Sequence, residues 1–149
     1  MPEFRTRYRV KAPLSAVVKF HEREDVLARL TPPPLQLDVL AREPLAEGSR
    51  LVFRLGLGPL GIIWEAIHQD VDLQHGFTDE QRRGPLQFWR HRHTFFPQSD
   101  GYTVIEEHIT YAYRPGWRSL WTWLVFSPLG LHLLFTYRRW AIRRALEQT

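Results

Sequence analysis

Two histidines separated by a single residue, His91 and His93, are the side chains of this sequence best suited to chemistry. Side chains alternate between the two faces of a strand, so both imidazoles point to the same side if their segment is extended. Neutral imidazole binds zinc, copper or iron, and histidine also transfers protons near neutral pH. Either role requires a further partner, and Glu107 on the next predicted strand is the obvious candidate.

Several interpretations of these three residues are open. They could be buried and hydrogen-bonded for structural reasons, they could contact a ligand, or Glu107 could act with a histidine as a general acid–base pair in an apolar pocket. In a structural role Glu107 needs a partner, which Arg138 on the terminal helix or the two histidines could supply; a bidentate ion pair with Arg138 would fix the helix against the sheet. Open metal sites usually need three protein ligands, and we predict no metal and no cofactor.

An alternating pattern over residues 87–96 predicts a strand with one aromatic, histidine-bearing face. That face carries Trp89, His91, His93 and Phe95, and the opposite, solvated face carries Arg90, Arg92 and Thr94. The turn-forming residues 97–101 connect it to a second strand over 102–113. The predicted inward residues of the second strand are Thr103, Ile105, Glu107, Ile109 and Tyr111.

The other elements follow from similar patterns. A first strand is expected over 4–10, then a helix beginning near 12–15 and a second short helix over 25–30, which three consecutive prolines at 32–34 end. Further strands are expected over 35–41, 50–57, 62–71 and 77–81. Because the loops between consecutive strands are short, the strands must pair antiparallel.

The last third of the chain predicts a helix over residues 129–148. Arg138 lies within the apolar arc of this helix, which indicates a partner or a polar pocket for its side chain. Residues 119–137 carry no charge, but Pro128 and Gly130 in their middle argue against a membrane span. We expect a loop over a cavity mouth there, with Trp117, Leu120, Trp121 and Trp123 as a possible peripheral membrane contact.

Composition fits one globular domain covering residues 1–149, with 44% hydrophobic and 24% charged residues. The absence of cysteine excludes disulfides and thiolate chemistry. The net charge of +4 is carried by scattered arginines without a long cationic run, so we predict no nucleic-acid binding. The first residues do not have the pattern of a signal peptide, and we expect a cytoplasmic location. The oligomeric state is left open.

The order of the elements is that of the α+β helix-grip fold, and several segments strengthen this. They are Gly61–His68, Phe77–Gln81, the Trp-x-His-x-His-x-Phe element after Gly84-Pro85, Glu106–Tyr111 and Phe135–Arg138. Together they resemble the SRPBCC superfamily, which includes START-like proteins and birch-pollen-allergen-like proteins. Within it they resemble the small bacterial branch called polyketide cyclase/dehydrase-like. The resemblance implies a curved antiparallel sheet wrapped around the terminal helix.

The same resemblance implies a cavity between sheet and helix that binds a small hydrophobic or amphipathic molecule. The residues expected to contact this molecule are Trp64, Trp89, His91, His93, Phe95, Glu107, Tyr111 and Arg138. Trp140 could extend the aromatic lining. One alternative is a cyclase or dehydratase that uses His91 or His93 with Glu107; motifs of the common serine hydrolases are missing. Another is a protein-interaction or membrane-contact module with a vestigial cavity.

Overall fold

Seven strands form one antiparallel sheet in the order β1-β7-β6-β5-β4-β3-β2. The computed structural model describes residues 1–147, apart from the side chain of Arg118. The strands are β1 (Glu3–Val10), β2 (Gln36–Arg42), β3 (Arg50–Leu57), β4 (Leu60–Asp72), β5 (Gly76–Arg83), β6 (Leu86–Pro97) and β7 (Thr103–Tyr113). Every predicted strand is present, and the antiparallel pairing is confirmed.

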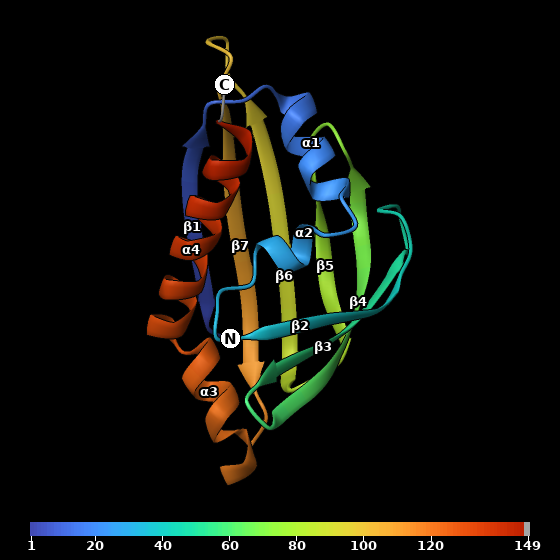
Figure 1. The fold of residues 1–149 in the computed structure, drawn as a ribbon, viewed down its shortest axis with the longest axis vertical. Helices are drawn as coiled ribbons and strands as arrows, with labels where there is room; N and C mark the ends of the chain where they lie inside the picture. The colour runs from blue at the N-terminus through green and yellow to red at the C-terminus, as the bar shows by residue number, and fades with distance from the viewer. Residues whose placement is uncertain (148–149) are drawn as a thin grey trace.

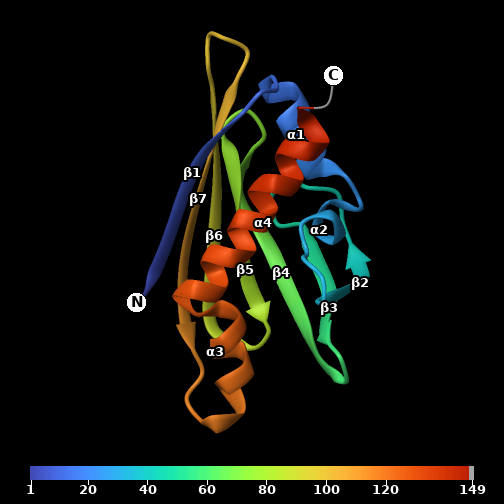
Figure 2. The ribbon, with the colours of Figure 1, turned by 60° about the vertical axis from the view of Figure 1, so that its left-hand side comes forward.

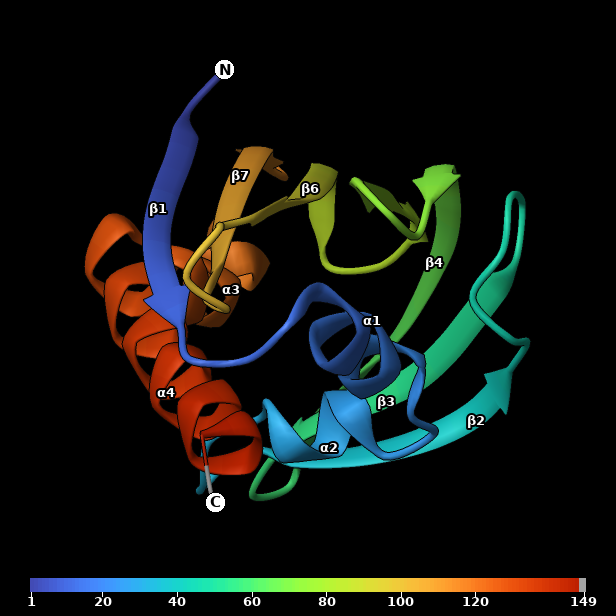
Figure 3. The same ribbon diagram turned by 90° about the horizontal axis from the view of Figure 1, so that it is seen from above.

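The sheet is strongly curved, and its helices lie on the concave side (Figures 1 and 3). The register shifts between Val39 and Ala41 in β2 and between Gln69 and Asp72 in β4. Such bulges bend a strand and increase its twist. The terminal helix α4 (Pro128–Leu146) lies along the β1 and β7 side, while α1 (Leu14–Glu22) and α2 (Val26–Arg29) cross the open side toward β2.

The start of α4 is defined by Ser127 and Pro128. The Ser127 hydroxyl accepts a hydrogen bond from the Gly130 backbone N–H at 3.1 Å, and Pro128 occupies the first turn, where a missing N–H is tolerated. The helix was predicted over 129–148 and is found over Pro128–Leu146; Gln148 lies outside the described residues.

The predicted loop before this helix is wrong, because residues 117–126 are helical. A short 3₁₀ turn (Trp117–Ser119) leads directly into α3 (Leu120–Phe126), and α3 meets α4 at a bend of 49°. Ser127 in an extended conformation, followed by Pro128, separates the two helices. No single helix in residues 1–147 is long and apolar enough to cross a membrane; α3 and α4 satisfy the length and composition only as this bent pair.

The core has two apolar clusters. One joins β3, β4, β6 and β7 to α3 and the first half of α4, and it contains Trp64, Trp89, Phe126 and Phe135. The other joins β1 and α1 to the end of α4, and it contains Phe77 and Phe95. His91 and His93 point inward between them, since the ring centroid of His91 lies 5.4 Å from that of Phe135 and that of His93 lies 4.2 Å from that of Phe77.

Candidate functional site

A cavity of about 140 Å³ lies between the concave sheet and the helices. Its apolar wall includes Phe53, Leu55, Trp64, Ala66, Trp89 and Phe126. Its polar wall includes His21, His68, Asp79, His91, His93 and Arg138. The cavity therefore has an apolar body and a patch of titratable groups, which suits a ligand with both kinds of surface.

Strand register brings the central polar groups together. Asp79 on β5 pairs with His91 on β6, and His93 on β6 pairs with Glu107 on β7. The alternating burial of β6 and β7 places His91, His93 and Glu107 on the inner face, as predicted. His91, His93 and Glu107 are each less than 10% exposed, and the Asp79 side chain is 21% exposed.

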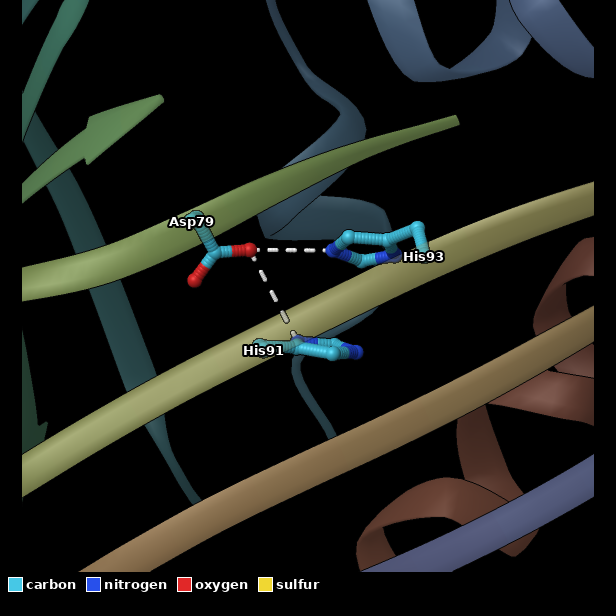
Figure 4. A group of neighbouring side chains, drawn as sticks. All are labelled: Asp79, His91 and His93. Carbon is cyan, nitrogen blue, oxygen red and sulfur yellow. Dashed lines mark hydrogen bonds and ion pairs between the residues drawn. The ribbon is translucent and has the colours of Figure 1, made fainter. Parts of the chain in front are cut away.

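The four groups form one connected network. His91 Nε2 donates a hydrogen bond to Glu107 Oε2, and His93 Nε2 donates to Asp79 Oδ2 at 2.9 Å. His93 Nδ1 lies 3.0 Å from Glu107 Oε2 without the angle of a hydrogen bond, so that contact is electrostatic. His91 Nδ1 lies 3.7 Å from Asp79 Oδ2 (Figure 4).

These contacts shift the pKa values of the two histidines in opposite directions. Burial lowers the pKa of His93, but the Glu107 and Asp79 carboxylates outweigh it and raise that pKa to about 9. Burial and the neighbouring His93 charge together lower the pKa of His91. Burial opposes ionisation of both carboxylates, yet the histidines hold the pKa of Asp79 at about 2 and that of Glu107 well below its usual range. At neutral pH His93 is therefore an imidazolium between two carboxylates, and His91 is neutral.

Five of the eight predicted contact residues line the cavity: Trp64, Trp89, His91, His93 and Arg138. Phe95, Glu107 and Tyr111 are buried but do not line it. Phe95 packs in the cluster with Phe77, and Tyr111 lies against Trp89 and Tyr113. Glu107 lies behind the two histidines. Trp140 is half exposed on the outer side of α4 and does not extend the lining.

The predicted ion pair between Glu107 and Arg138 is not formed in residues 1–147. Arg138 Nε instead donates to the Leu30 carbonyl at 3.3 Å, and its guanidinium lies 5.1 Å from the ring centroid of Phe135. The rotation of α4 points Arg138 toward the loop after α2, while the histidines satisfy Glu107. Arg138 thus connects the terminal helix to the loop that closes the cavity.

Sequence reasoning missed Asp79, His21 and His68 on the polar wall of the cavity. Asp79 lies in the segment Phe77–Gln81, which was used only for the family resemblance. Asp79 and His91 are equally distant from Pro85 along the chain, and they are paired in the sheet. His21 on α1 has its Nδ1 2.8 Å from the Val17 carbonyl oxygen, and His68 on β4 has its Nδ1 2.9 Å from Ser49 Oγ. Burial lowers the pKa of both, that of His21 to about 4, so both are neutral at pH 7.

Asp79, His91 and His93 could also hold a metal ion. One ligand atom of each lies within 4.8 Å of the others, and all three face the cavity. Sequence reasoning had considered Glu107 as the third ligand. The structure gives that position to Asp79, because Glu107 binds the far side of the histidines.

Comparison with solved structures supports the fold. The chain superposes over 99% of its length on a Chromobacterium violaceum protein, covering 98% of that chain with a TM-score of 0.79 and 13% identity. It also matches a START superfamily protein of Mycobacterium smegmatis (98% and 97% coverage, TM-score 0.66, 13% identity). A third match is norcoclaurine synthase of Thalictrum flavum in complex with dopamine and hydroxybenzaldehyde (97% and 85% coverage, TM-score 0.66, 15% identity).

No family model and no curated protein matches the sequence. The structural matches confirm the helix-grip fold of START-like proteins that the resemblance predicted. At these identities they establish the architecture alone, and any role has to be argued from the residues of this chain.

Proposed function

We propose that this protein binds a small amphipathic molecule of about one aromatic ring in the cavity between its sheet and helices. The observation that carries this proposal is the cavity itself, in which indole and phenyl rings form one wall and Asp79, His91 and His93 form another. An apolar ring would lie against Trp64, Trp89 or Phe126. A hydroxyl or amine on it would donate a hydrogen bond to the Asp79 carboxylate, and a carbonyl would accept a hydrogen bond from His93 Nε2.

The volume sets the size of this ligand. A dry cavity of about 150 Å³ is known to admit benzene, so the 140 Å³ found here suits a single substituted ring. A longer ligand requires α2 and the loop after it to move, since Leu27, Leu30 and Leu35 form that side of the cavity. The complex of norcoclaurine synthase with two single-ring compounds supports this size class for the fold.

Filling the cavity tests the proposal without breaking the core. Ala66 lies on β4, is 3% exposed and lines the cavity, so Ala66→Leu places three further carbon atoms in the void. We expect wild-type protein to bind some members of a panel of phenols, phenolic aldehydes and aromatic amines with a Kd of about 0.1 mM. Calorimetric titration should show Ala66→Leu weakening this binding by about tenfold or more, while thermal stability is kept or raised.

Ala41→Leu provides the matched control, because Ala41 lies on the exposed side of β2 and outside the cavity lining. It should bind the panel as the wild type does. Equal affinity of both variants and the wild type for every bound compound would place the ligand elsewhere and contradict the proposal.

A second candidate function, contact with a membrane surface, is favoured by a specific observation at the α3 end of the molecule. Six large apolar side chains on the 3₁₀ turn, α3 and the start of α4 are exposed: Trp117, Leu120, Trp123, Leu124, Leu129 and Leu133. Several exposed apolar side chains on one short segment favour an interaction site, and tryptophan prefers the membrane interface.

We infer that this exposed apolar segment contacts a bilayer that contains anionic lipid. The ends of β5 and β7 lie beside α3 (Figure 2), and the exposed Arg82, Arg83 and Arg114 are found there. Arg114 Nη2 donates to the Gly84 carbonyl at 3.2 Å in the β5–β6 turn. An apolar patch next to guanidinium groups complements a negatively charged lipid surface. Val125 and Phe126 of the same helix α3 line the cavity, so this helix carries both the exposed apolar side chains and part of the cavity wall.

Vesicle co-sedimentation tests the membrane contact. Leu120 is 63% exposed and Leu124 is 58% exposed, so the double change Leu120→Ser/Leu124→Ser should leave the fold intact. We expect it to lower the apparent affinity for phosphatidylglycerol-containing vesicles by roughly tenfold or more. The control Leu40→Ser changes a leucine of β2 that is 56% exposed and should have no effect. Wild-type protein that stays in the supernatant with these vesicles would refute the membrane role.

A further inference from the structure

We propose that Asp79, His91 and His93 form a binding site for a divalent transition-metal ion, with its free coordination positions facing the cavity. All three side chains line the cavity, and they come from adjacent strands of one rigid sheet (Figure 4). Metal binding at these side chains does not depend on the proposed ligand, although the ion would lie on the polar wall that the polar group of that ligand also faces.

The spacing of the ligand atoms fits a small ion. In a four-coordinate site with bonds of about 2.1 Å, neighbouring ligand atoms are about 3.4 Å apart. Asp79 Oδ2 lies 2.9 Å from His93 Nε2 and 3.7 Å from His91 Nδ1, which are distances on either side of that value. The remaining separation, between the two histidine nitrogens, is below 4.8 Å. Small rotations of the imidazoles would bring all three atoms to bonding distance.

Glu107 provides the support that histidine ligands of metals normally have. Its Oε2 accepts a hydrogen bond from His91 Nε2 and lies 3.0 Å from His93 Nδ1. One carboxylate therefore contacts the rear nitrogen of both rings, and both front nitrogens, His91 Nδ1 and His93 Nε2, turn toward Asp79. A carboxylate behind a histidine fixes the ring and increases its basicity as a ligand.

Charge also favours a divalent ion. Asp79 and Glu107 bring two carboxylates against two imidazoles, and the histidines and Glu107 are almost fully buried. A divalent cation would replace the extra proton of His93: once this proton has left, both imidazoles are neutral, as coordination requires, and the ion balances both carboxylates. Two imidazoles and one carboxylate favour Zn²⁺ or Fe²⁺ over Ca²⁺ or Mg²⁺, which prefer oxygen ligands.

The experiment is a titration of chelator-treated protein with Zn²⁺ and Co²⁺, and Mg²⁺ serves as the negative control. We expect one equivalent of Zn²⁺ to bind with a Kd of about 1 µM or tighter, and Co²⁺ to give a visible d–d absorption band. Asp79→Asn and His93→Gln should each weaken Zn²⁺ binding by about 100-fold. The absence of saturable binding to the wild type, or wild-type affinity in both variants, would overturn the proposal.

His75→Gln is the matched control for adventitious binding. His75 and Asp72 form an exposed pair with Nδ1 and Oδ2 2.7 Å apart, so they offer a histidine and a carboxylate outside the cavity. The proposal requires His75→Gln to bind Zn²⁺ as the wild type does. Loss of Zn²⁺ binding in this variant would show that the ion binds at His75 on the surface, and it would also overturn the assignment.

If Asp79→Asn or His93→Gln does not fold, a measurement on the wild type still tests the metal site. The Phe77 ring is stacked on His93 with centroids 4.2 Å apart, whereas Trp140 lies on the outer side of α4. Bound Co²⁺ should shift the Phe77 ring protons strongly in the NMR spectrum and leave those of Trp140 almost unchanged. The reverse pattern, or no shift at Phe77, would show that the ion is elsewhere.

Discussion

Replacing Glu107 with glutamine is expected to lower the free energy of unfolding by about 3–5 kcal/mol, the range for removing one partner of a buried ion pair. Glu107 is 3% exposed, and its Oε2 meets His91 Nε2 and His93 Nδ1. A glutamine of the same shape has no charge to balance the His93 imidazolium. Its NH₂ group can also face a histidine N–H, so that two donors meet without an acceptor. Urea denaturation followed by circular dichroism measures this loss.

The neighbouring residue supplies the control for Glu107. Glu106 lies on the same strand but points to solvent, where its Oε2 is 3.2 Å from Arg7 Nη1 and the Arg7 side chain is 60% exposed. An exposed pair of this kind contributes about 1 kcal/mol or less, so Glu106→Gln should hardly shift the denaturation midpoint. Equal effects of the two substitutions would show that the buried network does not stabilise the fold.

The inner faces of β6 and β7 could be predicted because a strand has a strict period of two. The burial of β6 alternates as predicted from Trp89 to Phe95, and that of β7 alternates from Ile105 to Tyr111; at the start of β7, Val104 is buried too. Arg90 and Arg92 alternate with the inward residues of β6, so only one assignment of the two strand faces keeps these arginines in solvent. The position of the histidine pair on the concave face therefore followed from residue types alone.

Asp79 was missed although its position follows from hairpin geometry. It precedes Pro85 by the same number of residues as His91 follows it, and these two residues are paired in the β5–β6 ladder. A turn centred on Pro85 thus predicts an aspartate opposite a histidine. Only Glu107 was predicted as the partner of the histidines, because the turn after Pro97 was taken into account and the turn before Leu86 was not.

Arg138 and residues 117–126 depend on tertiary packing, which residue patterns describe poorly. The angular position of Arg138 on α4 placed it on the inner side, but the choice between Glu107 and the Leu30 carbonyl depends on how the helix rotates over the sheet. Segment 117–126 is too short for a reliable helical period, and Pro128 and Gly130 after it favoured a loop. Packing of Phe126 against Trp64 and Trp89 stabilises the helix there.

A single methyl group added at Gly76 is expected to have an effect as large as the loss of Glu107. Gly76 begins β5 with φ of 138°, and a Cβ atom there would lie 1.9 Å from the carbonyl oxygen of His93. Backbone atoms cannot yield to such a contact, so Gly76→Ala must push β5 away from β6 beside the Asp79–His93 hydrogen bond. We expect a loss of at least about 3 kcal/mol in the free energy of unfolding, from the strained φ and the clash together.

Gly101→Ala separates the clash from the conformational strain. Gly101 also has a positive φ, 85°, but no atom lies within 4 Å of its added Cβ, so the variant should lose only about 1–2 kcal/mol. Denaturation curves of both variants give the comparison, and titration with the single-ring panel adds a functional measure. Because Gly76 lies against the backbone of His93 and Gly101 lies in the distant β6–β7 turn, ligand affinity should fall in the first variant and stay unchanged in the second. If the two alanines cost the same stability, the close approach of β5 to the backbone of His93 is not present in solution.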